Sequence, residues 1–592
     1  MNKRLEKFFP GENTLMVIIA SFIGVAAGFA NILFRFIEEL VHHYIFETGH
    51  HFLVGDGGWR LLFLPLIPMF GMLLLIPFAY FYKDEVNGYG FTKFLRKVNL
   101  EGGRIPFRTI WLKTVTTSLT IGSGGSAGVE GPIAMVGGAV GSQVGQFFRV
   151  SGDRMKVYIA AGCAGGIAAM FNAPIAGVFF AAEIVLLGTY EVSAFSALVI
   201  SSALASVVSR AVYGEISAFQ IPDYNVVSPM IEVPLYMLMG LLVGVVAVFY
   251  IKIFYWVRDR FASLALNRYM KPILGAFMVG SIGIGFPQVM GNGYHYISEV
   301  LNGDGVIWVM LLLVFAKIIS TSITLGSGGA GGVFAPSLFI GAVIGGSFGT
   351  IANNIFPGHI ASSGAYAAVG IGAFLAAVTH APLTAIFLLF EMTGNYLIII
   401  PIMLASIIGA VVSAKLYPDS IDTVDFTNEG IDIHDGRETA VLKSIKVGRA
   451  MVEDVDFISE RATAKDLLKI FSMAENSFYY PVLTESGKQA GQMCGIISMQ
   501  DVKAILHDEE LLQSATVGNI MYRNVITLTP DDDLYTAMSQ FMKKGIEEIP
   551  VVESLEEPWV VGMLRRRDVL SVYNREVLKR GISGKTASIR LK

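Results

Sequence analysis

The sequence contains few charged residues and few cysteines. Of its 592 residues only 16% are Asp, Glu, Lys or Arg, while 53% are hydrophobic; a soluble domain has about 25% charged residues. A wholly soluble protein is therefore excluded. The two cysteines, Cys163 and Cys494, are too few for a disulfide framework or a metal cluster. The net charge of −4 is too small to indicate nucleic acid as a partner.

Charge is also unevenly distributed along the chain. Residues 441–592 contain 20 Lys or Arg and 21 Asp or Glu, which is about 27% of that segment. The first 440 residues contain 24 and 27, or about 12%. This division predicts a multi-pass membrane body followed by a soluble tail.

Three uncharged or nearly uncharged runs have the length of a membrane span, which is about 20 apolar residues. They cover residues 13–34, 61–82 and 233–251. Residues 1–11 have no long apolar core beside a cleavage site, so we interpret them as a cytoplasmic N-terminal segment and not as a signal peptide.

A longer uncharged stretch is interrupted by helix breakers. The 73 residues between Lys317 and Glu391 contain no formal charge, yet glycines at 326–332 and prolines such as Pro336 and Pro382 divide them. Lipid offers no hydrogen bonds to the backbone that such breaks release, so that backbone must be buried in protein or line a wet cavity. The pattern predicts short, discontinuous membrane helices.

The membrane body contains an internal repeat. The segment 122–132 (GSGGSAGVEGP) recurs 204 residues later at 326–336 (GSGGAGGVFAP), and 168–183 matches 376–391 at a spacing of 208. Two matches at nearly one spacing indicate a duplicated unit. Paired broken helices in corresponding places predict a binding site where the two halves meet, near the middle of the membrane.

Each glycine-rich loop leads to a proline near a helix start, at Pro132 and Pro336. Proline is tolerated in a first helical turn because that turn leaves its amides unpaired. The remaining amides, together with the positive end of the helix dipole, form a site for an anion without a fixed cation. A phosphate-binding loop is excluded because no Lys-Ser/Thr pair follows either glycine run.

One difference between the two copies is informative: Glu130 stands where the other copy has Phe334. Glu130 is the single charged residue between Lys113 and Arg149, and an ionisable group inside a membrane segment is by default a functional candidate. Its carboxylate could occupy the place of an anion and swing away to let one pass. The alternative is that Glu130 only caps its helix.

The glycines have a structural alternative too. Small residues let membrane helices approach closely, and for the glycines after the two prolines, such as Gly137 and Gly341, packing is the favoured interpretation.

These motifs resemble those of the CLC family of chloride channels and chloride/proton antiporters. The resemblance implies an all-α polytopic membrane fold with two inverted repeats over residues 12–418, and a homodimer with one anion pathway per subunit. Glu130 would be the external gate. Backbone amides would bind the central and outer anions at Gly128, Val129, Gly131, Val333 and Phe334.

Two departures from the family pattern concern the inner entrance. Tyr89, in 88–92 (GYGFT), replaces the family's serine, and Asp422 falls near the position of its central tyrosine. A phenol can still donate a hydrogen bond to an anion, whereas an ionised carboxylate would repel one. Either Asp422 points elsewhere, or Tyr417 or Tyr89 supplies the hydroxyl.

A third departure concerns protons. The family's internal proton-relay glutamate directly follows the position of Glu183, and here Ile184 occupies that place. Glu183 remains as a possible relay, although its repeat counterpart Glu391 makes a structural role an equal alternative.

The tail resembles a tandem pair of CBS domains with an α/β fold. Residues 447–451 (VGRAM) recur as 517–521 (VGNIM), and each is followed by short β-branched runs. We expect a linker at 419–444, CBS domains at 445–510 and 511–575, and a C-terminal segment at 576–592. Asp501 and Asp568 are candidates for an adenine nucleotide's ribose or, alternatively, helix-capping residues.

The sequence therefore predicts a transporter of chloride or a similar anion in the inner or plasma membrane, not an enzyme, with no required cofactor and no metal site. Glu130 gates it, and cytoplasmic CBS domains modulate it.

Ile184 favours passive or loosely coupled conduction, with stoichiometric chloride/proton antiport as the alternative. A CBS-bearing magnesium transporter and a nucleotide-sensing membrane module are alternatives from other classes. The absence of an asparagine-bearing motif argues against fluoride, and Tyr89 leaves selectivity among other anions open.

Overall fold

The structure is a computed structural model that forms two compact units, Met1–Asn428 and Glu429–Lys592. The expected N-terminal segment 1–11 and the last residues of the C-terminal segment, 580–592, lie outside the described residues. The structure describes residues 12–55, 57–82, 85–86, 88–150, 152–188, 192–214, 224, 227–431, 433, 437–473, 479–485, 490–503 and 514–579.

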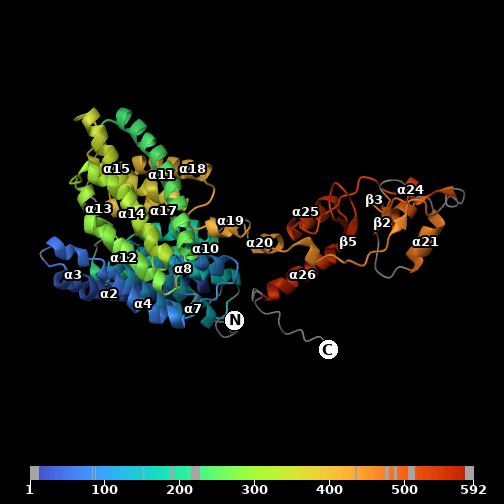
Figure 1. The fold of residues 1–592 in the computed structure, drawn as a ribbon, viewed down its shortest axis with the longest axis horizontal. Helices are drawn as coiled ribbons and strands as arrows, with labels where there is room; N and C mark the ends of the chain where they lie inside the picture. The colour runs from blue at the N-terminus through green and yellow to red at the C-terminus, as the bar shows by residue number, and fades with distance from the viewer. Residues whose placement is uncertain are drawn as a thin grey trace. The chain divides into compact units, whose positions relative to one another are not determined.

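The first unit is helical throughout its described residues (Figure 1). Its helices in the first half are α2 (Glu12–Val41), a π-helix (His42–Glu47), α3 (Thr48–Leu53), a 3₁₀-helix (Gly58–Phe63), α4 (Leu66–Phe81), α5 (Phe91–Asn99), α6 (Arg108–Gly122), α7 (Glu130–Phe147), α8 (Gly152–Phe171), α9 (Pro174–Phe180), a π-helix (Ala181–Val185) and α10 (Val192–Tyr213). Those in the second half are α11 (Pro229–Ser263), α12 (Met270–Gly285), a 3₁₀-helix (Pro287–Val289), α13 (Tyr294–Leu301), α14 (Ile307–Ser327), α15 (Phe334–Ile355), α16 (Ser363–Thr379), α17 (Pro382–Thr393), a 3₁₀-helix (Tyr396–Ile398), α18 (Ile399–Leu416) and α19 (Val424–Asn428).

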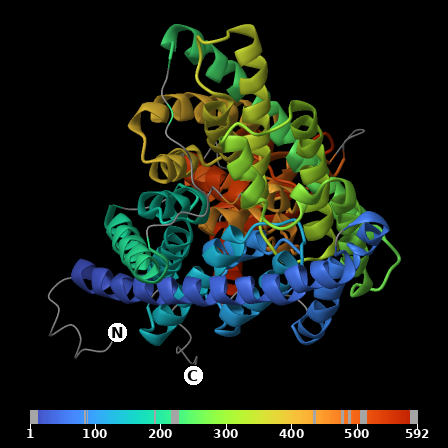
Figure 2. The ribbon, with the colours of Figure 1, turned by 90° about the vertical axis from the view of Figure 1, so that its left-hand side faces the viewer.

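Within the described residues, seven helices are long and apolar enough to cross a bilayer. They include Thr14–Leu53, Gly58–Phe81 and Pro229–Ser263, which cover the three runs predicted as spans to within one residue at each end. Figure 2 shows the first of these, blue, as one long rod across the membrane body. The multi-pass architecture is confirmed.

The predicted interruption between Lys317 and Glu391 is also confirmed. The stretch divides into the end of α14, then α15, α16 and most of α17. α15 and α16 pack so closely that a Cβ at Gly341 would collide with the carbonyl oxygen of Gly370. The same relation holds in the first half, where a Cβ at Gly137 would collide with the carbonyl of Gly162. The packing interpretation of these glycines is therefore confirmed.

The two glycine-rich loops pair with each other. The Gly128 amide donates to the Gly332 carbonyl at 2.7 Å, and the Gly332 amide donates back to the Gly128 carbonyl at 2.7 Å. This isolated antiparallel bridge satisfies backbone groups that neither a helix nor lipid would satisfy.

Threonines on α6 and α14 extend this pairing. The Thr120 hydroxyl oxygen accepts from the Ala330 amide at 3.0 Å, and the Thr324 hydroxyl oxygen accepts from the Ser126 amide at 3.1 Å. Both threonines and both donors are 204 residues apart. In such reciprocal contacts, one residue of the first half contacts a residue of the second half, and the repeat counterparts of the two make the same contact in the opposite direction. This pattern is produced by a two-fold axis. The structure therefore shows the duplicated unit as two halves related by a pseudo-two-fold axis.

The second repeated segment has the same symmetry. Glu183 caps the N-terminus of α17, and Glu391 caps the N-terminus of α9. The donors are the amides of Leu383 and Thr384 for Glu183, at 3.0 and 2.7 Å, and those of Ile175 and Ala176 for Glu391, at 2.9 and 2.8 Å. Each carboxylate thus satisfies helix amides of the opposite half and interacts favourably with its dipole.

The start of the expected linker belongs to the membrane body. The Ile421 amide donates to the Val378 carbonyl at 3.1 Å, and the Tyr255 hydroxyl donates to the Ile421 carbonyl at 2.8 Å. Asp425 forms an ion pair with Arg258 at 2.6 Å. The compact unit therefore ends at Asn428, ten residues later than the expected boundary at 418, because polar residues in this segment bind the body and do not form a free connection.

The second unit is an α/β structure of two similar modules. Its strands are β1 (Ile458–Ser459), β2 (Tyr479–Leu483), β3 (Met493–Ser498), β4 (Glu548–Val552) and β5 (Val560–Arg565), and its helices are α20 (Arg437–Lys443), a 3₁₀-helix (Val447–Arg449), α21 (Ala464–Met473), α22 (Met499–Lys503), α24 (Val517–Ile520), α25 (Leu534–Lys544) and α26 (Arg566–Lys579). β2 pairs in parallel with β1 and antiparallel with β3, and β4 pairs antiparallel with β5.

The two modules exchange their leading segments. Val452 pairs with Met563 of the second module, and Tyr522 pairs with Ile496 of the first. The core around Phe541 accordingly includes residues 441–450, which precede the first strand. Each hydrophobic core therefore takes part of its chain from the other module's segment.

The reciprocal caps give a testable prediction about stability. We expect Glu391→Ala to lower the free energy of unfolding by about 1–3 kcal/mol, because it leaves two amides at the start of α9 without their charged acceptor. Glu183→Ala should have a similar effect through α17. Thermal unfolding of the detergent-solubilised protein measures this, with the exposed Glu101→Ala as the control. Equal stability of Glu391→Ala and the control would contradict the capping role.

Candidate functional site

Glu130 is the first residue of α7 and is completely buried. One oxygen of its carboxylate accepts a hydrogen bond from the Ala335 amide at 3.1 Å, and the other accepts one from the Tyr294 hydroxyl. Ala335 lies in the first turn of α15. The carboxylate of one half therefore occupies the helix N-terminus of the other half, which is the place predicted for an anion.

A buried lysine contributes positive charge near Glu130. Lys317 is completely buried and interacts electrostatically with Glu130. Its ammonium group donates to the carbonyls of Val289 and Gly291 at 2.9 and 3.0 Å. The sequence interpretation did not select Lys317, although Lys113 lies 204 residues before it, at the spacing of the repeat, and is also buried.

A cavity of about 20 Å³ lies where the two halves meet. This volume accommodates about one water-sized particle. Its lining residues are Tyr89, Phe91, Gly131, Phe180, Ile184, Val333, Phe334, Thr379 and Asp422. The structure thus brings together predicted anion-site residues from both repeated loops and both residues of the altered inner entrance.

The predicted anion-binding amides have different positions. Val333 is the N-cap residue of α15 and lines the cavity, as do Phe334 and Gly131. Val129 is the N-cap residue of α7 but does not line the cavity. The Gly128 amide is engaged with the Gly332 carbonyl, so in this arrangement it joins the loops and is not available to an anion.

The two altered positions of the inner entrance contact each other. The Tyr89 hydroxyl donates a hydrogen bond to the Asp422 carboxylate, and both side chains line the cavity. Tyr417 is not among the lining residues; its ring lies under Lys252, 5.8 Å from the ammonium nitrogen. Of the alternatives left open by the sequence, the structure therefore has Asp422 at the cavity and Tyr89 as the source of the hydroxyl.

Ile184 and Glu183 point in different directions. Ile184 lines the cavity, whereas the Glu183 carboxylate accepts from backbone and hydroxyl groups at the start of α17. The π-helical turn of residues Ala181–Val185 separates the two side chains in this way; such turns are frequent at functional sites.

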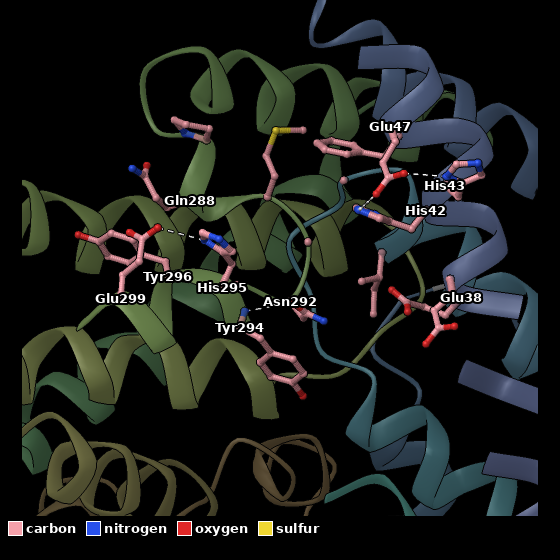
Figure 3. Close-up of a pocket in the computed structure, with 18 residues that line it drawn as sticks. Glu38, His42, His43, Glu47, Gln288, Asn292, Tyr294, His295, Tyr296 and Glu299 are labelled. Atoms are coloured by element: carbon pink, nitrogen blue, oxygen red, sulfur yellow. Dashed lines mark hydrogen bonds and ion pairs between the residues drawn. The ribbon is translucent and has the colours of Figure 1, made fainter. Parts of the chain in front are cut away.

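On the other side of Glu130 lies an open pocket of about 790 Å³ (Figure 3). Tyr294 is part of its wall, so the pocket leads to the hydroxyl that holds Glu130. Its other titratable lining residues are Glu38, Glu39, His42, His43, Glu47, His295, Tyr296 and Glu299. A ring nitrogen of His43 lies 2.7 Å from the Glu47 carboxylate, and one of His295 lies 3.1 Å from the Glu299 carboxylate. Tyr294, like Lys317, was not selected from the sequence, because nothing local in the sequence marks its contact with a residue 164 positions away.

The two aspartates of the CBS unit differ. The Asp501 carboxylate accepts from the Ser498 amide at 2.8 Å and the Ser498 hydroxyl at 2.6 Å, which is a capping arrangement at the start of α22. One carboxylate oxygen of Asp568, in the first turn of α26, is buried without a hydrogen-bond partner among the described residues.

Comparison with known proteins agrees with both units. Residues 70–414 match the family model "Voltage gated chloride channel", and residues 447–508 and 517–575 match the CBS domain. The chain is 33% identical over 419 residues to the H(+)/Cl(-) exchange transporter ClcA of Vibrio campbellii, covering 68% of this chain and 86% of that protein.

Two solved structures are also similar. A slow cyanobacterial Cl⁻/H⁺ antiporter matches with a TM-score of 0.62 at 25% identity, over 70% of this chain and 97% of that one. A eukaryotic CLC transporter matches over 93% of this chain and 97% of that one, with a TM-score of 0.61 at 20% identity, and this second likeness concerns the fold alone.

The tyrosine at Glu130 gives a testable prediction. We expect Tyr294→Phe to increase anion flux through the reconstituted protein about tenfold, because it removes a hydrogen bond to a charged group, worth about 1.5–3 kcal/mol, that holds the carboxylate in place. Chloride efflux from vesicles measures this. Tyr296→Phe is the matched control, since Tyr296 lines the same pocket but its ring packs on Phe339. An unchanged flux in Tyr294→Phe would contradict this role.

Proposed function

Because the chain belongs to the voltage-gated chloride channel (CLC) family, whose members transport anions, we propose that it exchanges chloride for protons across a membrane, with Glu130 as the gate. The observation that carries this proposal is the position of the Glu130 carboxylate on the amide of Ala335. A negatively charged side chain and a chloride ion compete for the same helix N-terminus.

This competition couples the two ions. An ionised Glu130 occupies the N-terminus and excludes chloride from it. A protonated Glu130 has no net charge and a weaker attraction to the helix dipole, so chloride displaces it. The outer pocket beside Tyr294, lined by carboxylates and imidazoles, offers a route by which the proton enters or leaves.

The relatives support exchange over the passive conduction favoured by the sequence alone. The similar protein of Vibrio campbellii is named an exchange transporter and the similar cyanobacterial structure an antiporter. Passive or loosely coupled conduction keeps one supporting observation, which is the presence of Ile184 where a proton-relay glutamate is expected. It is therefore the second candidate.

Flux measurements on reconstituted vesicles distinguish the two candidates. We expect an imposed chloride gradient to drive protons uphill through the wild-type protein. Glu130→Gln should abolish that proton movement while chloride flux persists. The reason is that a glutamine amide neither binds nor releases a proton and carries no charge that competes with chloride. Glu101→Gln is the matched control. A wild type that conducts chloride without moving protons would overturn exchange and support passive conduction.

We further infer a homodimer with an independent pathway in each subunit. Family membership supports the dimer, and the contacts between the two halves of one chain at Glu130 support a separate pathway in each subunit. The pair of CBS modules is proposed to lie on the cytoplasmic side of the inner or plasma membrane, where an adenine nucleotide would reach it.

One buried oxygen of the partly exposed Asp568 side chain supports nucleotide binding at the CBS pair. A ribose hydroxyl would donate to the oxygen that lacks a partner. We expect calorimetry of the full chain to detect binding of ATP, ADP or AMP, and Asp568→Asn to weaken it about tenfold. Asp501→Asn is the matched control, because Asp501 is already engaged by Ser498. Absence of binding by all three nucleotides, or equal loss in both variants, would contradict this role of Asp568.

A further inference from the structure

The wall of the central cavity contains one carboxylic acid among its described residues. Asp422 is 4% exposed and lines the cavity together with Phe334 and Val333. Among the described residues that line this cavity it is the one carboxylic acid. Ion pairs found among the described residues do not include Asp422, and the titratable groups that interact with it electrostatically are the phenols of Tyr89, Tyr250 and Tyr255.

The backbone around Asp422 is fixed, so its side chain is directed at the cavity by the fold. The preceding residue, Ile421, is held through its amide by Val378 and through its carbonyl by Tyr255. The side chain itself accepts a hydrogen bond from Tyr89, which lies just before α5. This resembles the arrangement at Glu130, which is buried and accepts from Tyr294.

An ionised carboxylate and an anion in one small cavity repel each other, and no cation of the described residues pairs with Asp422 to offset that repulsion. Occupation of the cavity by chloride therefore favours the protonated form of Asp422, and by linkage protonation of Asp422 favours chloride. A carboxylic acid at this place couples proton uptake to anion occupancy.

Other candidates for an inner proton acceptor are less suitable. Ile184 lines the same cavity but cannot bind a proton. The oxygens of Glu183 are both engaged by the start of α17. The Tyr89 phenol is the donor in its bond with Asp422, so Asp422 is the group with acceptor capacity.

We propose that Asp422 is the inner proton acceptor of this transporter and exchanges protons with Glu130 across the central cavity. The inference rests on the proposed exchange of chloride for protons. Glu130 is held by Ala335, directly after Phe334, and Gly131, directly after Glu130, lines the cavity. Glu130 therefore lies next to the cavity that the Asp422 side chain lines.

Each transfer moves one proton and no electrons. An O–H bond forms at an Asp422 oxygen as one breaks in a hydronium ion at the inner entrance. That bond then breaks as one forms at a Glu130 oxygen, through the single water-sized space of the cavity. Tyr89 is a positioning residue that keeps the acceptor turned toward this space.

The test compares proton and chloride movement in vesicles containing the wild type or Asp422 variants. We expect Asp422→Asn to lower the ratio of protons to chloride at least about tenfold while chloride flux persists, and Asp422→Glu to keep the wild-type ratio. Asp422→Tyr also removes the acid and should lower the ratio of protons to chloride as much as Asp422→Asn does. It provides a second variant if Asp422→Asn does not fold. Adding Ile184→Glu to Asp422→Asn should restore proton movement, because it returns an acid to the same cavity.

Two matched controls separate this role from a general effect of removing an acid. Asp425→Asn removes a neighbouring carboxylate that pairs with Arg258 outside the cavity, and Glu183→Gln tests the other acid; both should keep the wild-type ratio. If Asp422→Asn or Asp422→Tyr kept the wild-type ratio of protons to chloride, the inference would be overturned while exchange stands. The inference would also be overturned if Glu183→Gln alone lost that ratio. A wild type that moves no protons would refute exchange itself and the inference with it.

Discussion

The mutual pairing of two glycine-rich loops is the interaction on which the rest of the membrane body depends. Gly128 and Gly332 exchange two backbone hydrogen bonds of 2.7 Å, which places the starts of α7 and α15 side by side. A side chain at position 128 would collide with the Glu130 carboxylate and approach the Ala335 amide to 2.8 Å. Glycine is therefore required there, because the space that a Cβ would fill is occupied by the Glu130 carboxylate.

The pseudo-two-fold symmetry separates scaffold from function. Residue pairs that obey the symmetry hold the halves together: the reciprocal threonines, the reciprocal caps made by Glu183 and Glu391, and the stacked rings of Phe179 and Phe387, 208 positions apart with centroids 4.5 Å apart. One position that breaks the symmetry, Glu130 opposite Phe334, places a titratable group beside the central cavity in one half only.

The sequence predicted those features that either a short segment or the internal repeat reveals. The duplication, the broken helices and Glu130 were predictable because depletion of charge makes one acid conspicuous and because a repeat is visible in one chain. The Tyr294–Glu130 contact joins residues 164 positions apart, and the Tyr89–Asp422 contact joins residues 333 positions apart. No local sequence pattern predicts either contact. Polar residues after α18 were interpreted as a linker for a similar reason, since the partners that bury them, Val378 and Arg258, lie far away in the sequence.

Tyr89 and Asp422 show most clearly why separate positions can mislead. Considered singly, a bulky phenol at the inner entrance and an acid near an anion site each look unfavourable. Together they form one hydrogen-bonded unit in which the phenol satisfies a buried carboxylate that would otherwise be costly. The proposed pathway has an acid at each end, Glu130 and Asp422, and each accepts a hydrogen bond from a tyrosine that precedes or begins a short helix. Because the central cavity holds about one particle, an anion and a proton-carrying water would exclude each other from it, and this exclusion is how the proposed arrangement would couple the two ions.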